Sequence, residues 1–214
     1  MNFFFHLCNF LQRRTLNWFC DFDKSGVENV PPFGPLIVVS NHMSDIDPSI
    51  LAVTIKRRLW FLCKHEAFRT FAKRRFLYAY GAFPINREKA DFAALKWGVK
   101  KLKSNEVLVL FPEGHINYGQ MIKAKQGVVR IIQMTDATIL PVAITGTERF
   151  EHNVMRIFKP TGKITCTIGS PFSLPKIEGK ITPEVMDSLN EIIMERIANL
   201  LPEKYRGVYN ISDK

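Results

Sequence analysis

The chain of 214 residues is 46% hydrophobic, which is enough for one sizeable core and near the lower limit for two domains. With 23% charged residues, 12% aromatic residues and four cysteines, its composition excludes a disordered, collagen-like or disulfide-rich protein. The net charge of +10 indicates an anionic partner, such as phosphate, a lipid surface or nucleic acid.

An aromatic segment at 1–28 is expected to be helical and to precede an α/β domain at 29–214. Arg13 and Arg14 interrupt its apolar run after twelve residues, too few to span a bilayer. The segment also lacks the basic start and small-residue cleavage site of a signal peptide. We expect a helix lying in the membrane interface, with its aromatic side chains at headgroup level. A helix docked on the core or on a second subunit is the alternative.

Short β-branched or aromatic runs then alternate with helical patterns. The predicted strands are 36–40, 59–63, 107–111, 139–144 and 164–168. The predicted helices are 48–57, 66–80, 88–103, 122–134 and a last one that begins at Thr182, with Pro183 at its first position. This alternation predicts a single α/β domain with a mostly parallel or mixed sheet flanked by helices.

A basic patch occupies 56–75, where eight basic residues and one acidic residue, Glu66, alternate with aromatic and aliphatic side chains. Basic side chains can extend to lipid headgroups while aromatic rings enter the interface, so this mixture suits an anionic membrane surface. A solvated helix face beside a core strand is the alternative interpretation.

Two loops follow directly on predicted strands, at 41–48 and 111–115, and they open at the same edge of the sheet if the strands are parallel. In the first loop, the spacing of His42 and Asp47 lets a carboxylate hold one ring nitrogen while the other nitrogen faces a substrate, which makes a general base. Alternatively, Asp47 followed by Pro48 is a helix N-cap, and His42 is a hydrogen-bonded loop residue. Both roles are compatible for Asp47.

Four blocks, in order, resemble the glycerophospholipid acyltransferases typified by 1-acyl-glycerol-3-phosphate acyltransferase. The block from Asn41-His42 to Asp47 is similar to the family's N-H-x4-D block, and Phe111-Pro112-Glu113-Gly114 to its F-P-E-G block. The other two matches are Gly-Ala-Phe-Pro-Ile-Asn-Arg at 81–87 and the proline-containing strand at 139–144. The matches span 41–144, about half of the chain.

The resemblance implies transfer of a fatty acyl group from acyl-CoA or acyl carrier protein to a hydroxyl of a lysophospholipid. The expected acceptor is 1-acyl-sn-glycerol-3-phosphate, and the product is phosphatidic acid. Another headgroup, or glycerol-3-phosphate, is the alternative within the family. No cofactor or metal is implied beyond the acyl thioester as co-substrate. Because no Ser or Cys lies in a nucleophile elbow, we expect no covalent acyl-enzyme.

The resemblance also implies the roles of individual residues. His42 is the catalytic base, Asp47 orients it, and Arg87 binds the acceptor phosphate, which its guanidinium can contact through two nitrogens. Glu113 either supports Arg87 or accepts a hydrogen bond from a substrate hydroxyl. Gly114 lets the loop backbone approach the ligand, unless the Pro-Glu-Gly turn is purely structural. Lys64 stabilises the thioester oxyanion or binds phosphate.

The third block departs from the family pattern, because His115 and Ile116 stand where Thr or Ser and then Arg are usual. One expected cation is therefore missing. Either Lys123 or Lys125 replaces it, or the acceptor differs from the usual one. A metal site formed by His42, Asp47, Glu113 and His115 is a further alternative, although no dedicated ligand motif supports it.

The expected location is the cytoplasmic face of a membrane, as a peripheral, monotopic protein. The four scattered cysteines have no metal-ligand spacing and suit reduced thiols. The expected partners are the two substrates, an anionic membrane surface and, for one donor type, acyl carrier protein. A non-catalytic module that binds anionic lipid or nucleic acid is the rival interpretation, but no nucleic-acid fold signature is present.

Overall fold

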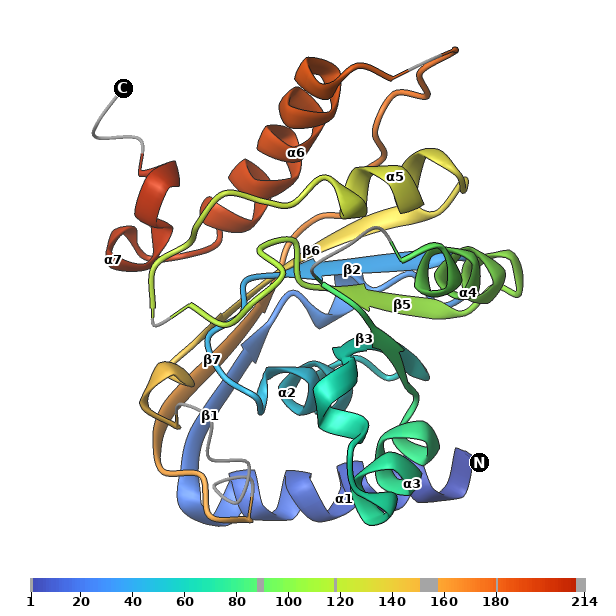
Figure 1. Ribbon diagram of the computed structural model, residues 1–214. Coiled ribbons are helices and arrows are strands. Elements are labelled where there is room, and N and C mark those ends of the chain that lie inside the picture. Colours follow the sequence, from blue (N-terminus) through green and yellow to red (C-terminus); the bar gives the residue numbers. More distant parts are fainter. Residues whose placement is uncertain (1, 88–90, 118, 151–157, 180, 211–214) are drawn as a thin grey trace.

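The computed structural model describes residues 2–87, 91–117, 119–150, 158–179 and 181–210 (Figure 1). The α-helices in these ranges are α1 (Asn2–Phe19), α2 (Asp47–Thr54), α3 (Phe71–Tyr80), α4 (Phe92–Lys103), α5 (Gly127–Gln133), α6 (Pro183–Ala198) and α7 (Glu203–Arg206). The strands are β1 (Cys20–Ser25), β2 (Leu36–Ser40), β3 (Leu59–Lys64), β4 (Ala82–Ile85), β5 (Val107–Leu110), β6 (Thr138–Thr145) and β7 (Gly162–Ile168).

The strands of the described residues form one sheet in the order β1-β7-β6-β2-β5-β3-β4. Neighbouring strands run parallel, except that β6 and β7 are antiparallel. The prediction of a single α/β domain with a mixed sheet flanked by helices is confirmed.

Alternate residues of β2 enter two different hydrophobic cores. Leu36 and Val38 pack with side chains of α1 and α2, whereas Ile37 and Val39 pack with side chains of α4, α5 and α6. Figure 1 shows these helix groups on opposite sides of the sheet. Each aliphatic side chain buried in this way contributes about 1.5–3 kcal/mol to stability. Because both faces of β2 are covered, successive residues are all apolar and the strand is an uninterrupted apolar run in the sequence.

The central strands bring several loops to one edge of the sheet. Leu36 of β2 aligns with Val107 of β5 and with Thr138 of β6, and all three strands are parallel. Strands β3 and β4 continue the parallel arrangement beyond β5. The loops that follow β2, β4, β5 and β6 therefore start at the same edge, as expected for the loops after β2 and β5.

The sequence did not indicate the two edge strands. Strand β1 has the polar sequence Cys-Asp-Phe-Asp-Lys-Ser, and β4 contains Pro84. Edge strands tolerate polar residues and proline because one side of their backbone needs no partner strand. Strand β1 lies within the segment 1–28, so the long helix of that segment ends at Phe19 and Cys20–Ser25 joins the sheet.

Four predicted helices are shorter than expected. The helix expected at 66–80 is divided into a 3₁₀ turn (His65–Phe68) and α3, because the Thr70 hydroxyl accepts a hydrogen bond from the Lys73 N–H and caps a new helix. The helix expected at 122–134 begins only at Gly127, because the N–H of Lys125 donates to the Pro112 carbonyl. Helix α2 ends at Thr54. Helix α4, expected from residue 88, begins at Phe92 because the Asp91 carboxylate accepts a hydrogen bond from the Ala94 N–H and caps it, and residues 88–90 lie outside the described residues.

Candidate active site

His42 and Asp47 form a buried pair in the loop after β2. The distance from His42 Nδ1 to Asp47 Oδ2 is 2.9 Å, and the two residues are 6% and 0% exposed. The same oxygen accepts hydrogen bonds from the backbone N–H groups of Met43, at 2.7 Å, and Ser44, at 2.8 Å. The loop therefore closes around the Asp47 carboxylate. Asp47 is the first residue of α2 rather than its N-cap, which is Ile46 and has no side-chain cap.

The second carboxylate oxygen of Asp47 is held from a distant part of the chain. The hydroxyl of Thr147, just after β6, donates to Asp47 Oδ1 at 2.6 Å, and Thr147 is fully buried. With both oxygens engaged, the carboxylate has a defined orientation. A carboxylate beside Nδ1 selects the tautomer that carries the proton on Nδ1, which leaves the lone pair on Nε2.

The ring of Phe111 fixes the plane of the His42 imidazole. The two rings are stacked, with centroids 4.0 Å apart and an interplanar angle of 20°. Among the described residues, the imidazole contacts the Asp47 carboxylate through Nδ1. The geometry is that of a general base, with one nitrogen oriented by a carboxylate and the other available to a substrate.

Glu113 connects the loops that follow β2 and β5. It is fully buried, and its Oε1 accepts a hydrogen bond from the His42 N–H at 3.1 Å. Its Oε2 accepts from the Asn117 side-chain amide and from the Ile122 N–H. Burial raises the pKa of Glu113 to about 7, although these hydrogen bonds lower it in part. These partners differ from the two roles that the sequence suggested, support of Arg87 or contact with a substrate hydroxyl.

The backbone around His42 is held on both sides. The Asn117 N–H donates to the His42 carbonyl at 2.8 Å, opposite the contact of Glu113 with the His42 N–H. The Asn41 side chain pairs with the backbone N–H and carbonyl of Ile144, both at 2.9 Å. Because these contacts tie the loop to β6 and to the loop after β5, the His42–Asp47 pair rests on a rigid frame.

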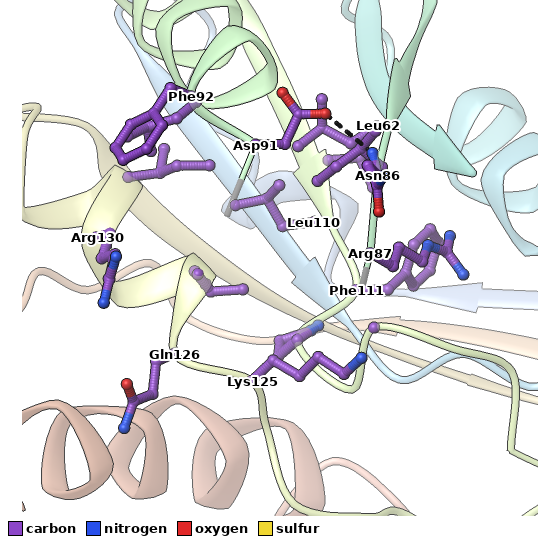
Figure 2. Close-up of a pocket in the computed structure, with 18 residues that line it drawn as sticks. Leu62, Asn86, Arg87, Asp91, Phe92, Leu110, Phe111, Lys125, Gln126 and Arg130 are labelled. Atoms are coloured by element: carbon purple, nitrogen blue, oxygen red, sulfur yellow. Dashed lines mark hydrogen bonds between the residues drawn. The ribbon is translucent and has the colours of Figure 1, made fainter. Parts of the chain in front are cut away.

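A pocket of about 310 Å³, here named the α4–α5 pocket, lies beside this pair. Phe111 lines it and also stacks on His42, so the pocket adjoins the imidazole. Figure 2 shows Arg87 beside Phe111 in this view and Arg130 on the other side of the pocket. Its walls are largely aliphatic and include Leu62, Leu95, Val109, Leu110, Val128 and Ile131.

The remaining predicted site residues occupy different positions. Arg87 is exposed and lines the α4–α5 pocket, as does Gly114, whose φ of 76° requires the left-handed conformation that glycine adopts readily. Lys64 is exposed at the end of β3 and is not part of the pocket lining. His115 is exposed, and in the described residues no group of three or more His, Cys, Asp or Glu side chains is placed to hold a metal ion.

Sequence analysis missed the roles of Thr147, Phe111 and Asn117. Thr147 is separated from Asp47 by 100 positions, so no local spacing connects them. Its position just beyond the end of β6 was the available indication, because the carboxyl ends of parallel strands meet at one edge. Asn117 was overlooked because it lies after the recognisable block that ends at Gly114.

The sequence is similar to those of known acyltransferases. A family model described as Acyltransferase matches residues 21–145. The 1-acyl-sn-glycerol-3-phosphate acyltransferase of Bacillus subtilis is 28% identical over 174 residues, which cover 81% of this chain and 84% of that protein. The enzyme of the same name from Streptococcus pneumoniae is 26% identical, over 79% of this chain and 59% of that protein.

The fold is also found among solved structures. The crystal structure of the 1-acyl-sn-glycerophosphate acyltransferase PlsC from Thermotoga maritima aligns with a TM-score of 0.70 and 22% identity, over 92% of this chain and 78% of that one. At this identity the similarity is one of fold. The family model, in contrast, matches more than half of the residues and includes His42, Asp47, Arg87 and Glu113. The chain belongs to the Acyltransferase family.

Proposed function

We propose that this acyltransferase transfers a fatty acyl group from an acyl thioester to the free hydroxyl of 1-acyl-sn-glycerol-3-phosphate. The observation that carries the proposal is the buried His42–Asp47 pair, whose ring adjoins a pocket lined by Arg87. The names of the bacterial relatives support the same acceptor. Acyl-CoA and acyl carrier protein are both compatible donors.

In the proposed reaction, His42 Nε2 accepts the proton of the acceptor hydroxyl while the hydroxyl oxygen attacks the thioester carbonyl carbon. Asp47 stabilises the imidazolium that forms. The tetrahedral intermediate then collapses, the carbon–sulfur bond breaks, and the leaving thiolate takes the proton from the imidazolium. Base catalysis of this kind accelerates a reaction by about 10² to 10⁴.

Direct transfer, without an acyl-cysteine intermediate, agrees with the environment of the thiols. Burial raises the pKa of Cys63, and it raises that of Cys166 to about 12. Both groups are therefore poor sources of thiolate. Labelled acyl-CoA should leave no protein-bound acyl group after denaturation, and recovery of a covalent adduct would indicate a two-step mechanism.

Arg87 is proposed to bind the acceptor phosphate. The direct experiment is a panel of lysophospholipids and glycerol-3-phosphate, each assayed with acyl-CoA and with acyl carrier protein as donor. Arg87→Ala should raise the KM for the phosphorylated acceptor about tenfold or more, because a hydrogen bond to a charged group contributes about 1.5–3 kcal/mol. Equal losses with a phosphate-free monoacylglycerol would contradict this role.

Peripheral binding to the cytoplasmic leaflet is also proposed, through α1 and α3. Helix α1 buries Phe5 and Leu16 in the core, but its opposite face leaves Phe3 80% and Trp18 71% exposed. Helix α3 lies beside it (Figure 1), where Phe4 and Phe76 are in edge-to-face contact, and exposes Phe71. No described helix is both long and apolar enough to cross a membrane.

The charge on this surface comes from part of the basic patch. Arg57 and Arg58 donate to backbone carbonyls and so stabilise the fold, whereas Lys73, Arg74 and Arg75 of α3 are exposed. Flotation with anionic and zwitterionic vesicles over a salt series tests the proposal. Binding that persists in part at high salt supports insertion of aromatic side chains. Binding to a random oligonucleotide with a steep salt dependence would favour the rival nucleic-acid module.

A further inference from the structure

Lys125 and Arg87 line the same pocket, and Ile116 stands at a position where the resemblance led us to expect an arginine. We propose that Lys125 supplies the missing second cation and binds the acceptor phosphate together with Arg87. This inference rests on the proposed function and adds a specificity-determining residue to it. Lys123, the other lysine that the sequence suggested, is not part of the pocket lining.

The backbone and the stem of Lys125 are both positioned by the loop after β5. Its N–H donates to the Pro112 carbonyl at 2.8 Å. A Cβ atom built on Gly114 would lie 2.8 Å from the Cδ atom of Lys125, so the lysine stem passes directly over this glycine. Figure 2 shows the side chain running toward the loop that carries Phe111, which stacks on His42. A phosphate held here would therefore lie near the catalytic imidazole.

Among the described residues, several positive groups gather at this end of the pocket. Partial burial lowers the pKa of His115, and the charges of Lys125, Arg87 and His42 lower it further, so several positive groups converge on one region. Within the described residues, neither Lys125 nor Arg87 forms an ion pair.

Two described carboxylates near the pocket, Asp91 and Glu113, are engaged with backbone N–H groups. Asp91, which lines the pocket, accepts hydrogen bonds from the backbone N–H groups of Asn86 and Ala94. Glu113 is fully buried and accepts from the His42 N–H. A dianionic phosphate ester bound between Lys125 and Arg87 would supply the negative charge that pairs with these two cations.

The test compares Lys125→Met with Lys123→Met, which removes the same charge two residues away. Lys125→Met should raise the KM for lysophosphatidic acid about 10- to 100-fold, as expected for the loss of a charged hydrogen bond. The KM for the acyl donor, and the activity toward monoacylglycerol, should change less than about twofold. Lys125→Arg should retain most of the affinity, and Lys123→Met should behave like the wild type.

Three results would overturn the inference. Equal losses with lysophosphatidic acid and monoacylglycerol would assign Lys125 a structural role. A higher KM for acyl-CoA with an unchanged acceptor KM would place it against a donor phosphate. Equal effects of Lys123→Met and Lys125→Met would indicate long-range electrostatic attraction without a defined site.

A binding measurement separates this inference from the proposed function. The wild type and Lys125→Met are titrated calorimetrically with lysophosphatidic acid below its critical micelle concentration, in the absence of donor. Tighter binding to the wild type supports the phosphate site even if no acyl transfer to this acceptor is observed, in which case the proposed function alone fails. Equal binding to both proteins overturns the inference.

Discussion

The hydroxyl of Thr147 lies 2.6 Å from the Asp47 carboxylate oxygen that does not contact His42. Both residues are fully buried, and Thr147 lies just after β6 whereas Asp47 begins α2. Oδ2 of Asp47 orients the imidazole, and Oδ1 is fixed by this hydroxyl. Thr147 therefore holds the carboxylate that orients the His42 imidazole.

Thr147→Val should lower kcat about tenfold to 100-fold with little change in the KM of either substrate. The valine removes a charge-assisted hydrogen bond, worth about 1.5–3 kcal/mol, and leaves a buried carboxylate oxygen without its donor. Thr147→Ser keeps the hydroxyl and should restore most of kcat. Steady-state kinetics of the two variants provide the measurement. Equal defects in both would show that the methyl group, not the hydrogen bond, matters.

Glu113→Gln should change how stability depends on pH. Because the pKa of Glu113 is raised from 4.5 to about 7 in the folded protein, the unfolded chain loses this proton at a lower pH than the folded one. The contribution of Glu113 to stability therefore falls as the pH rises from about 4.5 to about 7 and is then constant.

Urea unfolding of the wild type and Glu113→Gln at pH 5 and pH 8 measures this contribution. From pH 5 to pH 8, the free energy of unfolding of the variant minus that of the wild type should increase by on the order of 3 kcal/mol. Other titrating groups cancel in the comparison. Parallel pH profiles would show that the carboxyl group titrates normally in the folded protein.

Gly114→Ala should weaken acceptor binding as well as stability. The φ of 76° costs a non-glycine residue about 1–2 kcal/mol, and the new methyl group would displace the stem of Lys125. Gly34→Ala is a matched control, because Gly34 has a φ of 84° but no described residue other than its chain neighbours comes within 4 Å of the added Cβ. Thermal unfolding should show similar losses for both variants, and only Gly114→Ala should raise the KM for lysophosphatidic acid.

Replacing Phe3 and Trp18 by serine should reduce partition into anionic vesicles at least about tenfold, because each buried aromatic side chain contributes about 1.5–3 kcal/mol. Both residues lie on the outer face of α1. Phe33 is 82% exposed in the loop before β2, and Phe33→Ser is the control for the loss of an exposed aromatic ring. Vesicle flotation provides the measurement. Unchanged flotation of the double variant would show that α1 does not insert.

The parts of the fold that sequence could predict are those whose burial leaves a simple pattern. Strands β2, β5 and β6 are covered on both faces, so each is a short, continuous apolar run. Thr182 and Pro183 marked the start of α6 because a cap and a fixed φ act locally. Strands β1 and β4 were not predicted, because they lack a continuous apolar run and form through pairing with strands elsewhere in the chain.

The same distinction applies to the site. The spacing of His42 and Asp47 is local, and the structure brings the two residues within hydrogen-bond distance as expected. Thr147 reaches Asp47 only because β2 and β6 are neighbours in the sheet. The choice between Lys123 and Lys125 likewise required the loop geometry, since the two differ in sequence by only two positions.

Steady-state turnover of His42→Gln, with acyl-CoA and lysophosphatidic acid, tests the central claim most directly. Glutamine can fill much of the imidazole's space and can donate a hydrogen bond to Asp47, but it cannot accept a proton near neutral pH. The account predicts a loss in kcat of about 10² to 10⁴, with the thermal unfolding temperature largely unchanged. A variant that turns over within about twofold of the wild type would contradict the assignment of His42 as the catalytic base.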